Sequence, residues 1–189
     1  MRHVLAALLF ATPAGGDWLP LEPGTRWTYD VTAEASQAPA APEAVRQVVA
    51  EIKTATAASG DWTEASNFLG YATCWLRTTE TAVELRAEDA ADAPILAILR
   101  LPARAGDTWK GALGREEVAF TTGTEQTLDD GRRALRIDFQ IAAPEKHAGH
   151  AETRGALWFQ RGTGLVKASI TKDLDCHSAS TTVWRLRPE

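Results

Sequence analysis

The feature of this sequence that most constrains its fold is a regular alternation of apolar and polar side chains. In residues 134–141 (ALRIDFQI), the leucine, both isoleucines and the phenylalanine fall on one side of an extended chain, and the arginine, aspartate and glutamine fall on the other. A period of two is that of a β-strand with one packed and one solvated face, which is typical of antiparallel sheets. Residues 81–87 (TAVELRA) repeat the pattern.

Similar strand patterns, bounded by turn residues, recur along most of the chain. No segment has the long 3.6-residue periodicity of an amphipathic helix. Residues 95–101 (ILAILRL) are apolar at nearly every position and fit either a strand covered on both faces or a short buried helix. We therefore predict one all-β domain, a single curved antiparallel sheet of about nine or ten strands with at most short helices. The other expected strands are 26–31, 45–54, 71–78, 118–124, 156–160, 165–171 and 182–187.

The first residues have the pattern of an export signal. Arg2 and His3 precede an apolar run (VLAALLFA), and Pro13 and several small residues follow. This order is that of a secretory signal peptide, and the run is too short to cross a membrane as a helix, which takes about 20 residues. We predict a signal peptide over residues 1–16 and a single β-rich domain over residues 17–189, exported to the periplasm or the extracellular space. The alternative is a buried N-terminal helix or a misplaced start codon.

Charge and cysteine content narrow the function classes further. The 189 residues include 20 Lys and Arg against 25 Asp and Glu, a formal charge of −5, whereas nucleic-acid-binding domains usually carry a basic stripe. We therefore expect no nucleic-acid partner, and no segment after the signal approaches transmembrane length. Cys74 and Cys176 form an even pair in a chain expected to meet oxidising conditions, so we predict a disulfide between them; two unpaired thiols are the alternative.

One short pattern occurs twice. Residues 19–27 and 101–109 both read L-P-x-x-x-G-x-x-W. The proline keeps the approach extended, the glycine turns the chain, and the tryptophan enters the core at the start of a strand. The two copies indicate either two similar corners of one sheet or a diverged duplication, and a ligand-stacking tryptophan pair is the functional alternative.

Two segments resemble a family of uncharacterised exported bacterial proteins with a domain of unknown function. Residues 20–29 (PLEPGTRWTY) are similar to the family's P-L-x-x-G-x-x-W-x-Y opening, and residues 158–167 (WFQRGTGLVK) to its W-[YF]-x-x-G-x-G-L-V-K hairpin. The two motifs bracket most of the mature chain in the family's order. The resemblance implies a curved antiparallel sheet, an open or half barrel like that of periplasmic lipoprotein carriers. It carries over no catalytic residue.

Among catalytic and metal-binding motifs, the sequence contains one candidate. The sequence lacks a phosphate-binding loop, a nucleophile elbow and a zinc-protease helix. His147 and His150 form an H-x-x-H pair beside Glu145 and Glu152, and imidazole is a common ligand of zinc and copper. The same segment also fits a solvated loop. A metal-binding protein or metal-dependent hydrolase that uses His147, His150 and His177 is therefore the alternative function.

Tryptophan is the other conspicuous residue type, with seven copies. Trp27, Trp75, Trp109 and Trp158 could line a ligand cavity, or they could fill a core that the many alanines would leave hollow. We predict a non-catalytic exported binding or scaffolding module without a cofactor, which holds an apolar small molecule or a partner protein on the concave face of the sheet. The sequence does not indicate an oligomeric state.

Overall fold

The computed structural model describes residues 18–35, 45–56, 60–114, 116–141, 152–173 and 179–188. These residues form twelve strands and no helix. Their bounds are β1 Arg26–Ala35, β2 Arg46–Thr56, β3 Thr63–Phe68, β4 Tyr71–Thr78, β5 Ala82–Arg86, β6 Leu96–Arg100, β7 Thr108–Leu113, β8 Glu116–Thr127, β9 Arg133–Ile141, β10 Thr153–Gln160, β11 Gly164–Asp173 and β12 Ala179–Leu186.

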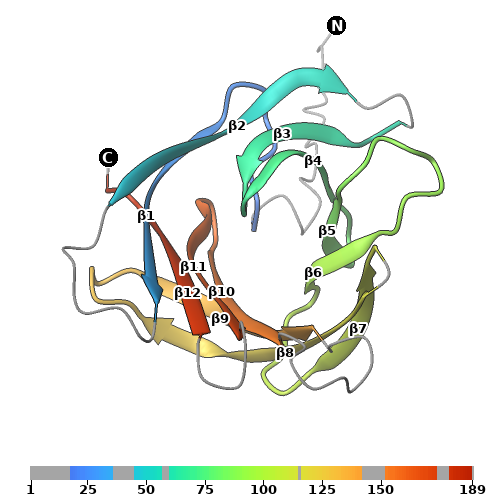
Figure 1. The fold of residues 1–189 in the computed structure, drawn as a ribbon. Helices are drawn as coiled ribbons and strands as arrows, with labels where there is room; N and C mark the ends of the chain where they lie inside the picture. The colour runs from blue at the N-terminus through green and yellow to red at the C-terminus, as the bar shows by residue number, and fades with distance from the viewer. Residues whose placement is uncertain are drawn as a thin grey trace, which may run out of the picture.

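All twelve strands belong to one antiparallel sheet in the order β6-β5-β4-β3-β2-β1-β12-β11-β10-β9-β8-β7. Each strand pairs with its neighbours in sequence except β6 with β7, and β1 also pairs with β12, so the sheet curls into a nearly closed barrel (Figure 1). The all-β antiparallel prediction is confirmed, and residues 95–101 contain a strand, β6. The predicted count of nine or ten strands was wrong, because β3 and β7 were not among the strands expected from the alternation of residues. The barrel is also more closed than the open or half barrel that the family resemblance implied.

The hydrogen-bonded ring is interrupted between β6 and β7, and side chains bridge this seam. Trp109 of β7 donates its indole Nε1–H to the carbonyl oxygen of Ala97 in β6 at 2.8 Å. Gly111 faces Leu96 so closely that an added Cβ would lie 2.7 Å from the leucine Cδ1. The two free strand edges, which would otherwise expose unpaired backbone groups, therefore pack against each other.

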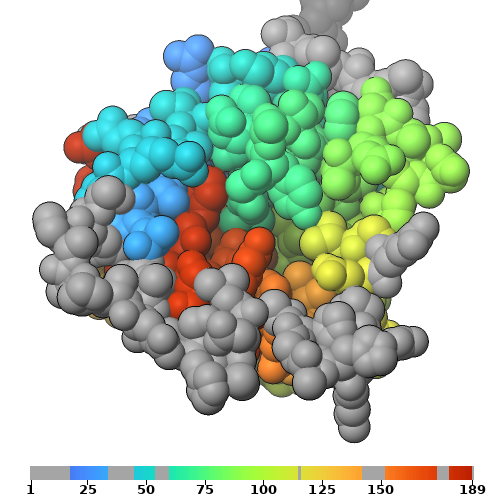
Figure 2. Space-filling model, in the orientation of Figure 1, coloured from blue at the N-terminus to red at the C-terminus, as the bar shows by residue number. Residues whose placement is uncertain are grey.

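Apolar side chains fill the inside of the barrel, and charged side chains occupy its outer face. The largest fully buried side chains include Tyr29, Phe68, Ile137 and Phe159, all members of one continuous core cluster. In the space-filling view, side chains occupy much of the space that the ribbon leaves open (Figure 2). Cross-strand ion pairs such as Arg77–Glu84 cover the outside, as the alternation of residues predicted.

The two L-P-x-x-x-G-x-x-W segments form matching corners. Gly24 and Gly106 have φ angles of 88° and 89°, a left-handed conformation that favours glycine. The backbone N–H of Gly24 donates to the carbonyl oxygen of Ile52 at 2.9 Å, and that of Gly106 donates to the carbonyl oxygen of Thr122 at 2.7 Å. One corner starts β1 and the other starts β7, so each begins one six-stranded half of the sheet.

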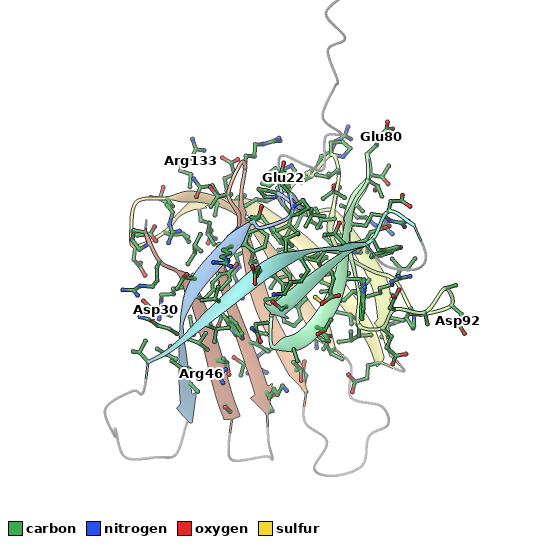
Figure 3. All side chains as sticks on the ribbon, turned by 90° about the horizontal axis from the view of Figure 1, so that it is seen from above. Glu22, Asp30, Arg46, Glu80, Asp92 and Arg133 are labelled. Atoms are coloured by element: carbon green, nitrogen blue, oxygen red, sulfur yellow. The ribbon has the colours of Figure 1, made fainter. Side chains whose placement is uncertain are left out.

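The strands define two ends of the barrel. The end at which β1 begins, called the rim here, also carries the turns before β9 and β11 and the residues after β12. Figure 3 shows Glu22, Glu80 and Arg133 towards this end and Arg46 towards the other. Segments far apart in the sequence therefore meet at the rim.

Candidate functional site

The two segments that carry the family resemblance contact each other at the rim. The indole Nε1–H of Trp27 donates to the carbonyl oxygen of Thr163, in the β10–β11 turn, at 2.7 Å. A Cβ added to Gly164 would lie 3.1 Å from Leu19 Cδ1, so the glycine allows this close approach. The guanidinium of Arg161 stacks over Trp18, with 4.3 Å between its Cζ and the ring centroid. The β10–β11 turn and the N-terminal segment therefore pack against each other and cover the end of the core.

Small-molecule sites have volumes of about 300–1,000 Å³. The rim has a groove of about 810 Å³ beside this contact. We call it the rim groove. It lies between the start of β1, the residues after β12 and the turns before β9 and β11. Among the described residues, its lining includes no Asp and no Glu but three arginines: Arg26, Arg132 and Arg187. Its apolar lining residues are Pro20, Trp27, Leu186 and Pro188.

The three arginines differ in how firmly they are held. Arg132 is the most constrained, because its Nη2 donates both to Asp130 and to the carbonyl oxygen of Leu186, the latter at 2.6 Å. Arg187 is the least constrained, because it is half exposed and its Nε lies 3.6 Å from the nearest carboxylate oxygen, on Asp30. The guanidinium of Arg187, with this loose partner, therefore remains available to an anionic ligand.

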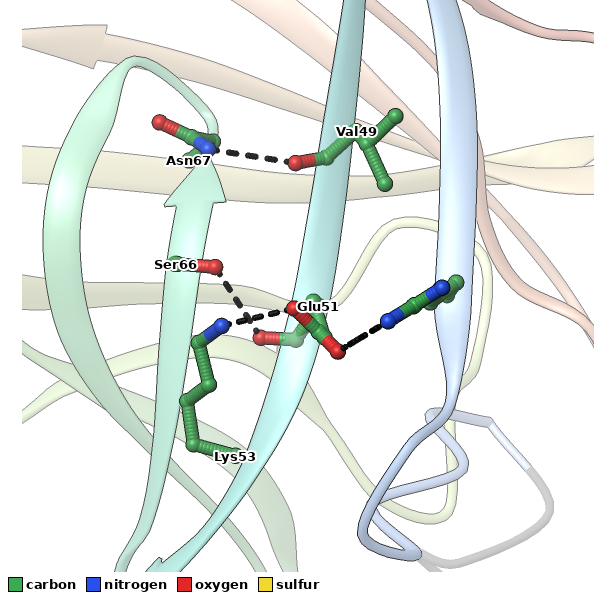
Figure 4. Close-up of polar contacts among 6 residues, drawn as sticks. Val49, Glu51, Lys53, Ser66 and Asn67 are labelled. Atoms are coloured by element: carbon green, nitrogen blue, oxygen red, sulfur yellow. Dashed lines mark hydrogen bonds and ion pairs between the residues drawn. The ribbon is translucent and has the colours of Figure 1, made fainter.

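Arg26 points away from the barrel and pairs with Glu51 on β2. Its Nε and Nη2 both donate to Glu51 Oε1, at 3.1 and 2.8 Å, and Lys53 donates to the other carboxylate oxygen (Figure 4). Hydrogen bonds from Lys53 and Arg26 lower the pKa of Glu51. Arg132 lowers the pKa of Asp130 in the same way. The carboxylates around the rim groove therefore stay ionised, and each holds one arginine beside the groove.

One lining side chain has an unused polar atom. The side-chain oxygen of Gln160 is buried and accepts no hydrogen bond from the described residues. A buried amide oxygen without a partner costs stability, so a ligand with a donor group could satisfy it.

A second groove, of about 460 Å³, crosses the outer face of β8 to β11, and we call it the outer groove. Small residues such as Ala119, Ala156 and Ser169 form part of its lining. Its charged lining residues are balanced: Arg136, Asp138, Glu152 and Arg154. Arg136 donates twice to Asp138, and Arg154 pairs with Asp173 at 2.9 Å.

The four tryptophans considered as ligand-lining residues do not share one surface. Trp27 and Trp109 are 4% and 5% exposed inside the barrel, where their ring N–H groups bind backbone carbonyls. Trp75 and Trp158 lie on the outer face, because their cross-strand neighbours are charged residues such as Glu64 and Lys167. Trp27 alone lines the rim groove and Trp158 alone lines the outer groove. Trp27 and Trp109 are therefore members of the packed core cluster and do not line a common cavity.

The histidines predicted as metal ligands and one cysteine of the predicted disulfide lie outside the described residues. These are His147, His150, His177 and Cys176, so the metal alternative and the disulfide stay predictions. Within the described ranges, no cluster of three His, Cys, Asp or Glu side chains is placed to hold a metal ion. Cys74 is buried and forms no disulfide with a described residue, and burial raises the pKa of its thiol to about 12. The predicted signal peptide also falls outside the described part of the chain.

No family model and no curated protein matches the chain. Among solved structures, the chain is similar to a protein from Parabacteroides distasonis described as a "putative lipoprotein". The two are 14% identical, the match covers 89% of this chain and 97% of the other, and the TM-score is 0.46. In the described part of the chain, no helix has the length and apolar character needed to span a membrane.

The rim groove was missed by sequence reasoning because its arginines come from three distant segments. Arg26 follows the first corner, Arg132 lies in the turn before β9, and Arg187 follows β12. The sequence feature that could have indicated this groove is the pair of segments 20–29 and 158–167, which pack together and form one wall of it.

Proposed function

We propose that this chain is an exported, non-catalytic binding module and that it binds an organic anion in the rim groove. The observation that carries the proposal is the lining of the groove: its described residues include three arginines and no Asp or Glu, although the whole chain has a charge of −5. A guanidinium group donates two parallel hydrogen bonds to a carboxylate or phosphate, which suits anion recognition.

The composition of the lining also indicates the character of the ligand. Leu186 and the two prolines lie next to the arginines, so an alkyl or ring portion of the ligand would contact them while its anionic group meets Arg187 and Arg26. The core cluster packs the inside of the barrel, so the proposed site moves from the concave face to the rim. The proposal includes export because the N-terminal sequence has the pattern of a signal peptide.

Calorimetry with a matched pair of probes tests this function. We expect octanoate to bind at least tenfold more tightly than octylammonium, because the two differ in the sign of the charge and share an alkyl chain. Arg187→Gln should weaken octanoate binding about tenfold to a hundredfold, since a hydrogen bond to a charged group contributes about 1.5–3 kcal/mol.

Arg133→Gln is the control, because Arg133 lies at the same end, pairs with Glu125 and does not line the groove. Equal affinity for the two probes would overturn the proposal. So would octanoate binding that survives both Arg187→Gln and Arg26→Gln.

A further inference from the structure

A row of four side chains crosses the outer face of β9 to β12 beside the outer groove. The register places Arg136 opposite Trp158, Trp158 opposite Lys167, and Lys167 opposite Arg185. The Cζ of Arg136 lies 5.5 Å and the Nζ of Lys167 4.8 Å from the Trp158 ring centroid. Three cations and one indole therefore form a continuous strip, which we call the cationic row.

Two of these cations have no ion-pair partner in the part of the chain that the structure describes. Arg136 donates to Asp138 at 2.8 and 2.6 Å, but neither Lys167 nor Arg185 forms an ion pair with a described residue. Asp30, the register neighbour of Arg185 on β1, pairs instead with Arg187. Like charges directly opposite each other on a sheet destabilise it, and Lys167 is half buried. An anion bound between the two side chains would remove this repulsion.

The outer groove provides room for the rest of such a ligand. Ser169 and Thr171 follow Lys167 on the same face of β11 and line the groove, and the hydroxyl of Thr171 is 2.9 Å from that of Thr181. A volume of about 460 Å³ lies in the range of small-molecule sites. Among the lining residues, Arg136 and Arg154 balance the charges of Asp138 and Glu152, so the groove offers donors and acceptors without further net charge.

We propose that the outer groove is a second ligand site, separate from the rim groove, for a polar organic anion of about the size of a sugar phosphate. The oxyanion binds between Lys167 and Arg185. The hydroxyl-bearing body lies over Ser169 and Thr171, where side-chain hydroxyls and the paired charges bind it. The proposal does not depend on ligand binding in the rim groove.

Calorimetry at constant ionic strength tests the site with glucose 6-phosphate, inorganic phosphate and glucose as probes. Glucose 6-phosphate should bind at least tenfold more tightly than either inorganic phosphate or glucose, because it alone combines the oxyanion with the polar body. Lys167→Gln and Arg185→Gln should each lower its affinity at least tenfold.

Lys110→Gln is the matched control, since Lys110 is an exposed outer-face lysine that pairs with Glu117 on the neighbouring strand β8. Its affinity for glucose 6-phosphate should equal that of the unchanged protein. Thermal unfolding of Lys167→Gln and Arg185→Gln should be as cooperative as that of the unchanged protein, which shows that the variants are folded. Equal affinities for glucose 6-phosphate and inorganic phosphate, undetectable binding of both, or an unchanged affinity in Lys167→Gln would overturn the proposal.

Discussion

Replacing Trp109 with phenylalanine should open the seam between β6 and β7. The substitution removes the indole N–H that donates to Ala97 at 2.8 Å and retains a ring that can stack on Phe120, whose centroid lies 5.1 Å from that of Trp109. Leaving the Ala97 carbonyl unpaired costs about 1–2 kcal/mol, and the lost ring atoms cost about 1 kcal/mol, roughly the value of one buried methylene. The free energy of unfolding should therefore fall by about 2–3 kcal/mol.

Thermal unfolding and amide hydrogen exchange measure this effect. For a domain of this size, each kcal/mol shifts the Tm by about 2–4 °C, so Trp109→Phe should lower it by roughly 4–12 °C. Exchange should accelerate in β6 and β7 more than in β1 and β12, whose backbones are hydrogen bonded to each other. The faster exchange would locate the damage at the seam.

Trp75→Phe provides the comparison. Trp75 is half buried on the outer face, and its indole N–H makes no hydrogen bond with a described residue. This variant should lose less than about 1 kcal/mol. If the two variants lower the Tm equally, or if Trp109→Phe leaves exchange in β6 and β7 unchanged, the indole does not close the seam and the reasoning fails.

Three further predictions concern packing, charge and the cysteines. Gly155→Ala should lower the free energy of unfolding in urea by about 3 kcal/mol or more, because the new Cβ would lie 2.2 Å from a backbone oxygen of β11. Gly111→Ala should lower it less, because the new Cβ would meet the movable end of a leucine side chain. The lowered pKa of Glu51 stabilises the fold above the unfolded pKa, and this contribution is lost as the pH falls below about 4.5, so Glu51→Gln should flatten the acid side of the Tm profile. Non-reducing mass spectrometry should show the loss of two hydrogens expected for a Cys74–Cys176 disulfide, and two free thiols in denaturant would contradict that prediction.

Much of the fold could be predicted because apolar and polar side chains alternate in the sequence of strands such as β9. Leu135 and Ile137 of this strand are buried, and Arg136 between them is partly exposed, as the alternation predicts. In β3 the inward positions include Thr63 and Ala65, which carry too little apolar surface to produce a visible period. In β7 an inward position is glycine.

Strand β6 was ambiguous for a different reason. Ile98 and Leu99 are consecutive and both buried, which strict alternation does not allow. The structure shows a register shift opposite them, between Val83 and Glu84 of β5. Such a bulge turns one extra residue out of the alternation, and a single sequence does not reveal its position.

The candidate sites could not be predicted to the same extent. The rim groove depends on the meeting of three turns, and the cationic row depends on the register of β9 to β12. Lys167 and Arg185 are ordinary outward residues in the sequence, and only their positions in the sheet make them neighbours. The local alternation predicts which face a residue occupies but not which residue lies beside it on another strand.

The way the sheet closes, through the β1–β12 pair and the seam between β6 and β7, has a consequence for the rate of folding. Every hydrogen-bonded strand pair is a local hairpin except β1 with β12, which joins Tyr29 to Leu186 at opposite ends of the described chain. A circularly permuted chain that began at Leu101, with a linker between residues 188 and 18, would make that pairing local and leave only the seam to close between distant strands. Because rates rise as contacts become more local, the permuted barrel should refold faster than the natural order of the chain.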